Sequence, residues 1–387
     1  MTMSNAEKYE LIDALCEALE KEKPIEEIKE LISKGADVNG MHFYTHPFDE
    51  EWEQSWVKPL FCAKTVEQVK LLIDAGADVN GADSRGCSVL RSARTAEIAK
   101  VLLEAGADVK GRDVLSAANT VEHTKLLLDA GADVNARDEV GRTVLMYAAM
   151  YAETAQTKLF IEAGADVNAK DVFGETALMK AATAEQTKLL LEAGADVNAK
   201  SSDGGMALMQ AATVEQTKLL LEAGADINVK DKYGHTALMY AETAEQTKLL
   251  IEVGEDVNAK SREGKTALIY AKTVEQTKLL LEAGADINVK DKYDHTALMY
   301  AETAEQKAFL QAVLEKKAVR EHIETRKSQI LKSRQIRKRM EEQNPTEKMS
   351  NVALADEIAK DKISGKEKRT ITPSVALDIK RRKAAEK

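Results

Sequence analysis

Residues 187–200 read TKLLLEAGADVNAK, and the pentapeptide EAGAD inside this segment returns along the chain at a fixed interval of 30 residues. A period of this length is typical of a solenoid, in which each repeat packs on its neighbours. Solenoids mostly bind other molecules, so the pattern favours a binding function over catalysis. The glycines on this register are Gly164, Gly194, Gly224 and Gly284, with Gly254 in the variant VGED.

The register extends toward the N-terminus with less regular spacing, through Gly35, Gly76, Gly106 and Gly131. Nine units can be counted in this way, and the regular part of the array begins at about residue 143. A tenth unit opens at Thr296, but AEQKAFLQAVLEKKA continues where the next glycine is expected. This continuation predicts a C-terminal capping helix.

The unit that begins at Thr236 shows how the repeat makes its structure. Thr236 is expected at the N-cap of a short first helix. Thr243 and Gln246 form a capping box for a second helix, and the same box is expected in every unit. Gly254 then ends that helix in the left-handed conformation, which glycine adopts at little cost. Residues 260–265 follow as a hairpin finger, so each unit is predicted to hold two helices and one finger.

The repeated KLLLEAGADVN segment and the threonine-capped helix before it resemble the ankyrin repeat, over about residues 5–315. The resemblance implies an all-α solenoid of about ten helix-turn-helix units with hairpin fingers. Two departures stand out. The family's Pro-Leu-His is Ala177-Leu178-Met179 here, which removes a histidine used for hydrogen bonds between repeats. Regular units are also three residues short of the usual 33, and only the unit after Thr143 keeps full length, which implies a tighter turn between the helices.

Composition and sorting signals favour a cytoplasmic protein, and we expect a monomer. The three cysteines have no disulfide or metal-ligand spacing, which favours a reducing compartment. There is no apolar run of 18 residues and no basic segment followed by an apolar one at the N-terminus, so neither a membrane span nor a cleavable signal peptide is predicted. The near-identity of the later units indicates recent duplication. Because such duplication is common in bacterial ankyrin proteins, a secreted effector acting on host proteins is the alternative.

Charge divides the chain into two parts of opposite sign. Residues 316–387 hold 21 Lys and Arg against 11 Asp and Glu, a net charge of +10. The totals of 55 and 65 then leave 34 and 54 for residues 1–315, a net charge of −20. This charge division separates a basic helical tail (316–387) from the rest of the chain. Within the rest we expect an N-terminal capping repeat (1–57) and the repeat array (58–315).

The tail contains a run from Arg326 to Arg339 without any acid. One interpretation is a solvated helix that balances the acidic array. The other is an anionic partner, either nucleic acid or a membrane surface. Aromatic residues are absent from the tail, so base stacking is not available to it. Breaks at Pro345 and between Gly365 and Pro373 predict two or three helical pieces. The candidate anion-binding residues are Arg334, Arg337, Lys338 and Arg339.

Residues 41–57, MHFYTHPFDEEWEQSWV, form an insertion that contains both tryptophans of the chain, Trp52 and Trp56. Their spacing of four places them on one face of a short helix. They are interpreted either as a cover for the first repeats or as anchors for a partner. The motif His46-Pro47-Phe48 resembles the start of the Fic active-site motif, but DEEWEQ stands where its glycine-rich continuation belongs, so transfer chemistry is not predicted.

The sequence does not predict an enzyme, and no cofactor or metal is expected. His235 and His295 occupy equivalent finger positions in units that are two apart, roughly 20 Å if repeats stack at the usual helix spacing. No Ser-His-Asp arrangement, phosphate-binding glycine loop or paired carboxylate motif stands out. The histidines are therefore interpreted as repeat features rather than as ligands.

Protein binding is the function that the resemblance implies, on a concave surface made from finger tips and the exposed side of the first helices. The residue after Ala-Leu-Met, or after its equivalent in other units, forms a tyrosine-rich column on this surface. Tyrosine is common at interfaces, although these rings could instead fill space between first helices. The predicted activity is that of a non-enzymatic scaffold or adaptor for a protein whose identity stays open. The candidate column residues are Tyr147, Lys180, Gln210, Tyr240, Tyr270 and Tyr300, and the finger candidates are Tyr233, Arg262 and Tyr293.

Overall fold

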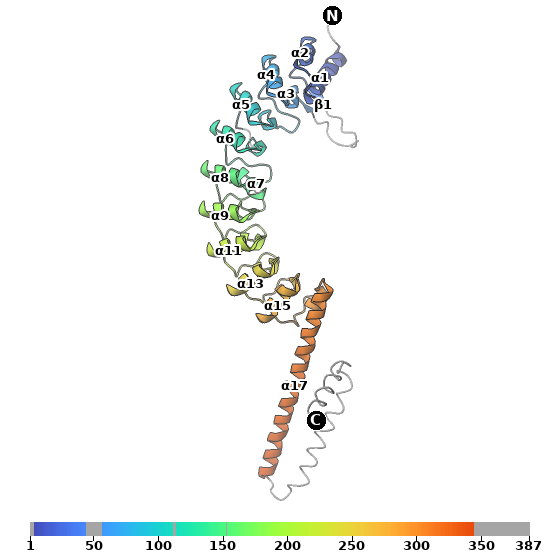
Figure 1. The fold of residues 1–387 in the computed structure, drawn as a ribbon, viewed down its shortest axis with the longest axis vertical. Coiled ribbons are helices and arrows are strands. Elements are labelled where there is room, and N and C mark those ends of the chain that lie inside the picture. Colours follow the sequence, from blue (N-terminus) through green and yellow to red (C-terminus); the bar gives the residue numbers. More distant parts are fainter. Residues whose placement is uncertain (1–3, 44–55, 111–113, 152, 344–387) are drawn as a thin grey trace. The chain divides into compact units, whose positions relative to one another are not determined.

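The computed structural model describes residues 4–43, 56–110, 114–151 and 153–343. The chain divides into two compact units, Met1–Gln306 and Lys307–Lys387. The first unit is a row of helix pairs that follow one another in sequence order (Figure 1). It opens with α1 (Asn5–Glu20) packed on α2 (Ile25–Ser33).

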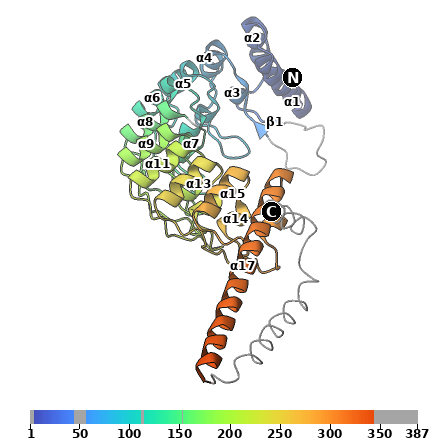
Figure 2. The ribbon, with the colours of Figure 1, turned by 60° about the horizontal axis from the view of Figure 1, so that its bottom comes forward.

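The second helices of the later pairs form one continuous row in the first unit (Figures 1 and 2). Each of them is nine residues long in the described part of the chain, and consecutive members pack on one another. Leucines at one repeated position, Leu190, Leu220, Leu250 and Leu280, are buried between them. The row consists of α4 (Val66–Asp74), α5 (Ala96–Glu104), α6 (Val121–Asp129), α8 (Thr154–Glu162), α9 (Ala184–Glu192), α11 (Val214–Glu222), α13 (Ala244–Glu252) and α15 (Val274–Glu282).

The first helices are shorter, as expected for the unit that begins at Thr236. Most are a single turn, and residues 177–180 form a turn rather than a helix. The exception is α7 (Val144–Met150), which lies in the unit that the sequence identifies as full length. The others are α3 (Pro59–Cys62), the 3₁₀ helices η1 (Leu90–Ser92) and η2 (Leu115–Ala117), α10 (Ala207–Gln210), α12 (Ala237–Tyr240), α14 (Ala267–Tyr270) and α16 (Ala297–Tyr300).

Threonine caps begin most second helices, but the full capping box is less general than the sequence predicts. The Thr213 hydroxyl accepts a hydrogen bond from the Gln216 N–H at 3.2 Å, and equivalent bonds occur in neighbouring units. Among the described second helices the reciprocal bond back to the N-cap backbone is complete only at Thr65 and Thr243. Thr236 stands at the N-cap of α12 without a side-chain cap bond. The glutamines make a second contact through their side-chain amide nitrogens, whether or not the box is complete.

That second engagement is a buried ladder of glutamines that links consecutive repeats. The Gln216 side-chain amide donates to the carbonyl of Ala181 at 2.7 Å, and the Gln246 amide donates to Ala211 at 2.8 Å. Each glutamine also reaches a threonine hydroxyl on the preceding second helix, as Gln216 does with Thr187 at 3.3 Å. Hydrogen bonds between repeats therefore do not need the histidine that the family uses at the first helix.

A second ladder runs along the loops after the second helices. The Asn198 side chain donates to the Gly224 carbonyl at 3.1 Å and accepts from the Asp226 N–H at 2.8 Å. Asn168 makes the same pair of bonds to the following unit. Because one side chain satisfies a backbone acceptor and a backbone donor, it fixes the spacing of adjacent units.

The fingers are tight turns, and successive turns are joined by backbone hydrogen bonds. Within one finger the Asp231 N–H donates to the His235 carbonyl at 3.0 Å. Between fingers the Arg262 N–H donates to the Tyr233 carbonyl at 2.7 Å, and the Lys232 N–H donates to Asp203 at 2.6 Å. Regular strands in the described residues are limited to β1 (His42–Phe43) and β2 (Trp56–Val57), which pair antiparallel.

The turn residue of each finger has a positive φ, and its neighbours decide which residue fits. A Cβ on Gly234 would lie 2.9 Å from the Arg262 nitrogen of the next finger, so a side chain there would disrupt the bond between fingers. The last finger has Asp294 at this position, with a φ of 63°. No further finger packs against it within the described residues, which explains why a side chain is tolerated there.

The helix α17 (Ala304–Gln343) starts at the expected tenth unit and continues without a break through residue 316, the start of the predicted tail. Gln306 repeats the ladder contact, since its amide donates to the Ala271 carbonyl at 2.7 Å. The proline and glycine breaks predicted for the tail lie beyond Gln343, outside the described residues.

Candidate binding surface

The first residue of a finger is an aspartate in most regular units, and this carboxylate organises the finger. In the unit of Tyr240, Asp231 Oδ1 accepts from the backbone N–H groups of Tyr233 and His235, both at 2.8 Å. Its other oxygen, Oδ2, accepts from the Tyr240 hydroxyl at 2.7 Å. One buried carboxylate therefore holds the turn and ties it to the first helix.

The predicted column residues are the partners of these aspartates. Tyr147 donates to Asp138 at 2.7 Å, and Tyr300 donates to Asp291 at 2.6 Å. Lys180 replaces the tyrosine with a cation, which lies 3.1 Å from Asp171. These column residues thus contact the first residues of the fingers.

Two column positions depart from this arrangement because their finger begins with serine. Tyr270 follows Ser261, and its hydroxyl lies 2.9 Å from His235 Nε2 of the preceding unit. Gln210 follows Ser201 and is exposed, and its side chain makes no hydrogen bond with the described residues. The column is therefore interrupted at Gln210.

Electrostatics reinforce the hydrogen bonds that Asp231 makes to Tyr240 and to the finger backbone. Burial opposes ionisation of Asp231, but the Tyr240 hydroxyl and the two backbone donors outweigh it, so the pKa of this carboxyl stays below its ordinary value. Burial and the same bond to Asp231 raise the pKa of Tyr240. The charged carboxylate and neutral phenol are thus the stable pair at neutral pH.

An aromatic cluster covers the later part of the column. The His235 ring packs edge-on against Tyr240 and Tyr270, with centroids 5.5 and 5.4 Å apart. The Lys265 ammonium lies 5.0 Å from the centroid of the Tyr300 ring. These contacts explain why Tyr270 and Tyr300 are only half-exposed, whereas 43% of Tyr240 remains exposed.

The finger tips carry the most exposed rings of the surface. Tyr233 is 51% exposed and Tyr293 is 64% exposed, while Arg262 on the finger between them is also exposed. Phe173, which sequence analysis did not select, occupies the equivalent tip position and is 52% exposed. Counting tip positions along the repeat would have found it.

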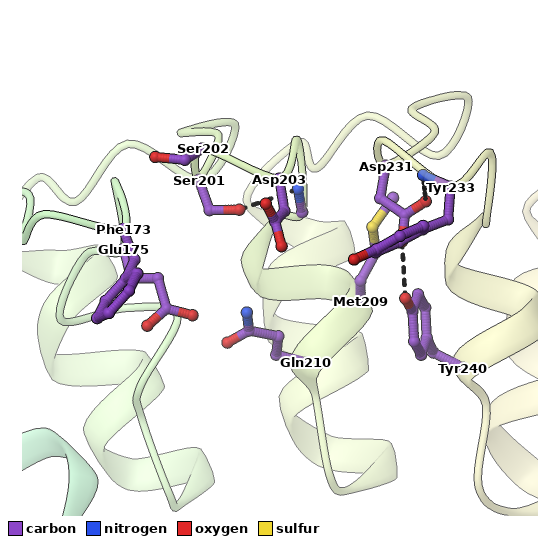
Figure 3. Close-up of a pocket in the computed structure, with 11 residues that line it drawn as sticks. Phe173, Glu175, Ser201, Ser202, Asp203, Met209, Gln210, Asp231, Tyr233 and Tyr240 are labelled. Carbon is purple, nitrogen blue, oxygen red and sulfur yellow. Dashed lines mark hydrogen bonds between the residues drawn. The ribbon is translucent and has the colours of Figure 1, made fainter.

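A cleft of about 320 Å³ opens where the column is interrupted. Figure 3 shows Phe173 and Glu175 on one side of it and Tyr233 and Tyr240 on the other, with Gln210 between them. The cleft has a local cause in the sequence, since Gly205 and Gln210 stand where the following unit has His235 and Tyr240.

Comparison with known proteins assigns the family. A family model described as "Ankyrin repeats (3 copies)" matches residues 114–201, 185–261, 204–291 and 242–325. Together the matches span residues 114–325, more than half of the chain. The chain belongs to the ankyrin-repeat family.

One solved structure similar to this ankyrin chain is the ankyrin repeat domain of Bcl-3, described as a unique member of the IkappaB protein family. It is 28% identical, the match covers 52% of this chain and 96% of that chain, and the TM-score is 0.40. Comparison with curated proteins gave no match. Ankyrin repeats are protein-interaction modules, so this general role follows from the family.

The aromatic insertion of the ankyrin chain is described only in part. Trp52 and the His46-Pro47-Phe48 motif lie outside the described residues. Trp56 lies on β2 opposite Phe43 and is half-buried, and its carbonyl accepts from the Ser84 N–H at 3.0 Å. The backbone of Trp56 therefore joins β2 to the finger that begins at Asp83.

The basic candidates lie on α17, in the second compact unit. Arg334, Lys338 and Arg339 are exposed, and Arg337 is half-buried. Of the helices described, α17 included, none is long and apolar enough to span a membrane. Nor do the described residues contain a cluster of three or more histidines, cysteines or acids suited to a metal.

Proposed function

We propose that this chain is a non-enzymatic scaffold or adaptor that binds a protein partner on its finger face, defined as the column and the finger tips together. The observation that carries the proposal is the exposure of Phe173, Tyr233 and Tyr293 at the tips of fingers that are held in place. Rigid, exposed aromatic side chains bury much area on binding and lose little conformational entropy.

The rigidity comes from the contacts beneath the rings. Each aspartate ties its finger to the column, as Asp231 does through Tyr240, and backbone bonds join one finger to the next. A surface that is already ordered does not pay that entropy when the partner arrives. The finger face is therefore suited to binding a folded partner or an extended peptide.

The experiment is quantitative affinity capture from lysate with a triple variant, Phe173→Ala, Tyr233→Ala and Tyr293→Ala. These substitutions leave the hydrogen bonds between Asp231 and Tyr240 and between Asp291 and Tyr300 intact. We expect loss of the captured partner with an unchanged helical circular dichroism signal. The matched control replaces Lys188, Lys218 and Lys248, exposed on the second helices, with alanine. Equal capture by both variants would place the binding site elsewhere.

A second candidate function is anion binding by α17. It is favoured by Lys332, Arg334, Lys338 and Arg339, which are exposed on one continuous helix in a segment without acids. Such a concentration of positive charge attracts polyanions through long-range electrostatics. Its test is the salt dependence described in the Discussion.

A further inference from the structure

The repeats of this chain provide an internal template for what the cleft beside Gly205 can hold. The last residue of a finger stands just before the N-cap of the first helix. In neighbouring units the side chain at this position reaches the column residue of the following unit. His235 Nε2 lies 2.9 Å from the Tyr270 hydroxyl, and Lys265 Nζ lies 5.0 Å from the Tyr300 ring centroid.

Gly205 occupies this last finger position and has no side chain to extend toward Tyr240. The ring of Tyr240 is accordingly more exposed than those of Tyr270 and Tyr300. The space that the missing side chain leaves is the cleft of about 320 Å³, and Gly205 itself lines it. The template therefore predicts a cation or an imidazole in contact with Tyr240.

The lining of the cleft suits a cation. Its aromatic members are Phe173, Tyr233 and Tyr240, and a positive charge is attracted to the face of such rings. Its charged members are all acidic: Glu175, Asp203 and Asp231. A cation in this cleft would face both aromatic rings and carboxylates.

The acids are already engaged, but they keep further acceptor capacity. Glu175 pairs with Lys180, and Asp203 pairs with Lys232. A carboxylate has about four lone-pair sites, so one ion pair does not saturate it. The Lys232 ammonium also lies 4.9 Å from the Tyr233 ring centroid, so the rim of the cleft already holds an ammonium group between a carboxylate and an aromatic ring.

We propose that the cleft beside Gly205 receives one lysine or arginine side chain of the polypeptide bound on the finger face. This inference rests on the proposed protein-binding function and names the chemistry of one contact within it. The charged end of the incoming side chain lies against Tyr240, and the exposed Gln210 amide, which has no hydrogen bond with the described residues, is available to the neighbouring peptide backbone.

The test uses three peptides, acetyl-Gly-X-Gly-amide with X as lysine, arginine or norleucine, titrated into the full chain. Met209 lines the cleft, so its ¹³C-labelled methyl group reports binding by nuclear magnetic resonance. We expect saturable shifts with the lysine or arginine peptide and at least tenfold weaker binding of the norleucine peptide. Equal binding of the norleucine peptide, or no shift with any of the three, would overturn the proposal.

A pair of variants at Gly205 supplies the control. The φ of Gly205 is outside the left-handed region, and a Cβ there would meet only Ser201 Oγ, at 3.4 Å. Gly205→Lys is expected to fill the cleft in the way that Lys265, at the equivalent position two units later, covers Tyr300, and to weaken the basic peptides at least tenfold. Gly205→Ala adds a single methyl group and should weaken them far less than Gly205→Lys does. Unchanged binding by Gly205→Lys would contradict the assignment.

One further outcome distinguishes a polypeptide side chain from a small amine as the source of the cation. Another distinguishes failure of the cleft inference from failure of the proposed function. If butylammonium binds as tightly as the lysine peptide, the cleft selects small amines and the polypeptide proposal fails. If no peptide binds while the Phe173, Tyr233 and Tyr293 triple variant still loses a captured partner, the cleft inference fails and the proposed function stands. Peptide binding without any partner lost by the triple variant supports the cleft alone.

Discussion

The side-chain amide of Gln216 donates a hydrogen bond to the carbonyl of Ala181, which lies 35 residues earlier in the sequence and one repeat away in the stack. The backbone N–H of the same glutamine donates to the hydroxyl of the Thr213 cap. One residue type thus starts a helix and joins it to the preceding repeat. Because the glutamine is repeated, its contribution is repeated along the array.

Gln216→Met should test this link. Methionine has a similar length but cannot donate, so the half-buried Ala181 carbonyl loses its partner, at a cost of about 1 kcal/mol in the free energy of unfolding. Urea unfolding monitored by circular dichroism measures the change. The neighbouring exposed change Glu215→Gln is the control and should have little effect. If both variants unfold at the same urea concentration, the ladder is not stabilising.

His123 stands at the ladder position of α6, and it should make the array sensitive to acid. The ring is buried, and neither nitrogen has a hydrogen-bond partner among the described residues. Burial lowers the pKa of this imidazole, against a smaller opposing effect of Glu97. Since the unfolded chain then takes up the proton first, stability should fall as the pH drops below about 6.5.

His123→Gln should remove this part of the pH dependence. In the next unit Gln156 holds the equivalent position, and its amide donates to the Ala118 carbonyl. For a glutamine in place of His123 the equivalent acceptor is the Ala93 carbonyl. We expect the variant to be more stable at pH 5.5 than the unchanged chain, with a smaller gain at pH 8. Urea unfolding at a series of pH values measures both. Parallel stability curves for the two proteins would exclude His123 as the source.

Substitutions at two equivalent turn positions of the fingers should change the stability of the array in opposite directions. Gly234→Asp places a side chain at a φ of 78° and against the Arg262 nitrogen, so it should destabilise the array by about 1–2 kcal/mol or more. Asp294→Gly relieves the left-handed aspartate of the last finger and should raise stability by up to about 1 kcal/mol. Thermal unfolding of both variants measures the contrast. A stabilising Gly234→Asp would mean that the fingers are not in register as described.

The basic helix should govern association with polyanions in a salt-dependent way. Replacing Arg334, Arg337, Lys338 and Arg339 with glutamine should lower the salt concentration needed for elution from heparin. The effect should fade between roughly 50 and 300 mM salt, because exposed charges are screened as the Debye length shortens. The control replaces Lys188, Lys218, Lys248 and Lys278 of the acidic array. Equal shifts in the two sets would mean that net charge alone controls retention.

Much of the fold could be predicted from residue types because the repeat is local. Thr243, Gln246 and Gly254 mark the two ends of one helix by hydrogen bonding and φ preference within a few residues. The same reasoning located the column, since a fixed offset from the repeat glycine marks one face of the stack. It missed Phe173 because the next tip along the chain is Asp203, so aromatic tips do not occur in consecutive units.

The sequence by itself determined the period, the helix boundaries and the family, because these depend on contacts within one repeat. Only the tertiary structure decided which residues of neighbouring repeats meet. That Gln216 reaches Ala181, that His235 reaches Tyr270, and that Gly205 leaves a cleft beside Tyr240 all follow from the distance and rotation between stacked units. Those quantities are set by side-chain packing across the interface, which no single repeat contains.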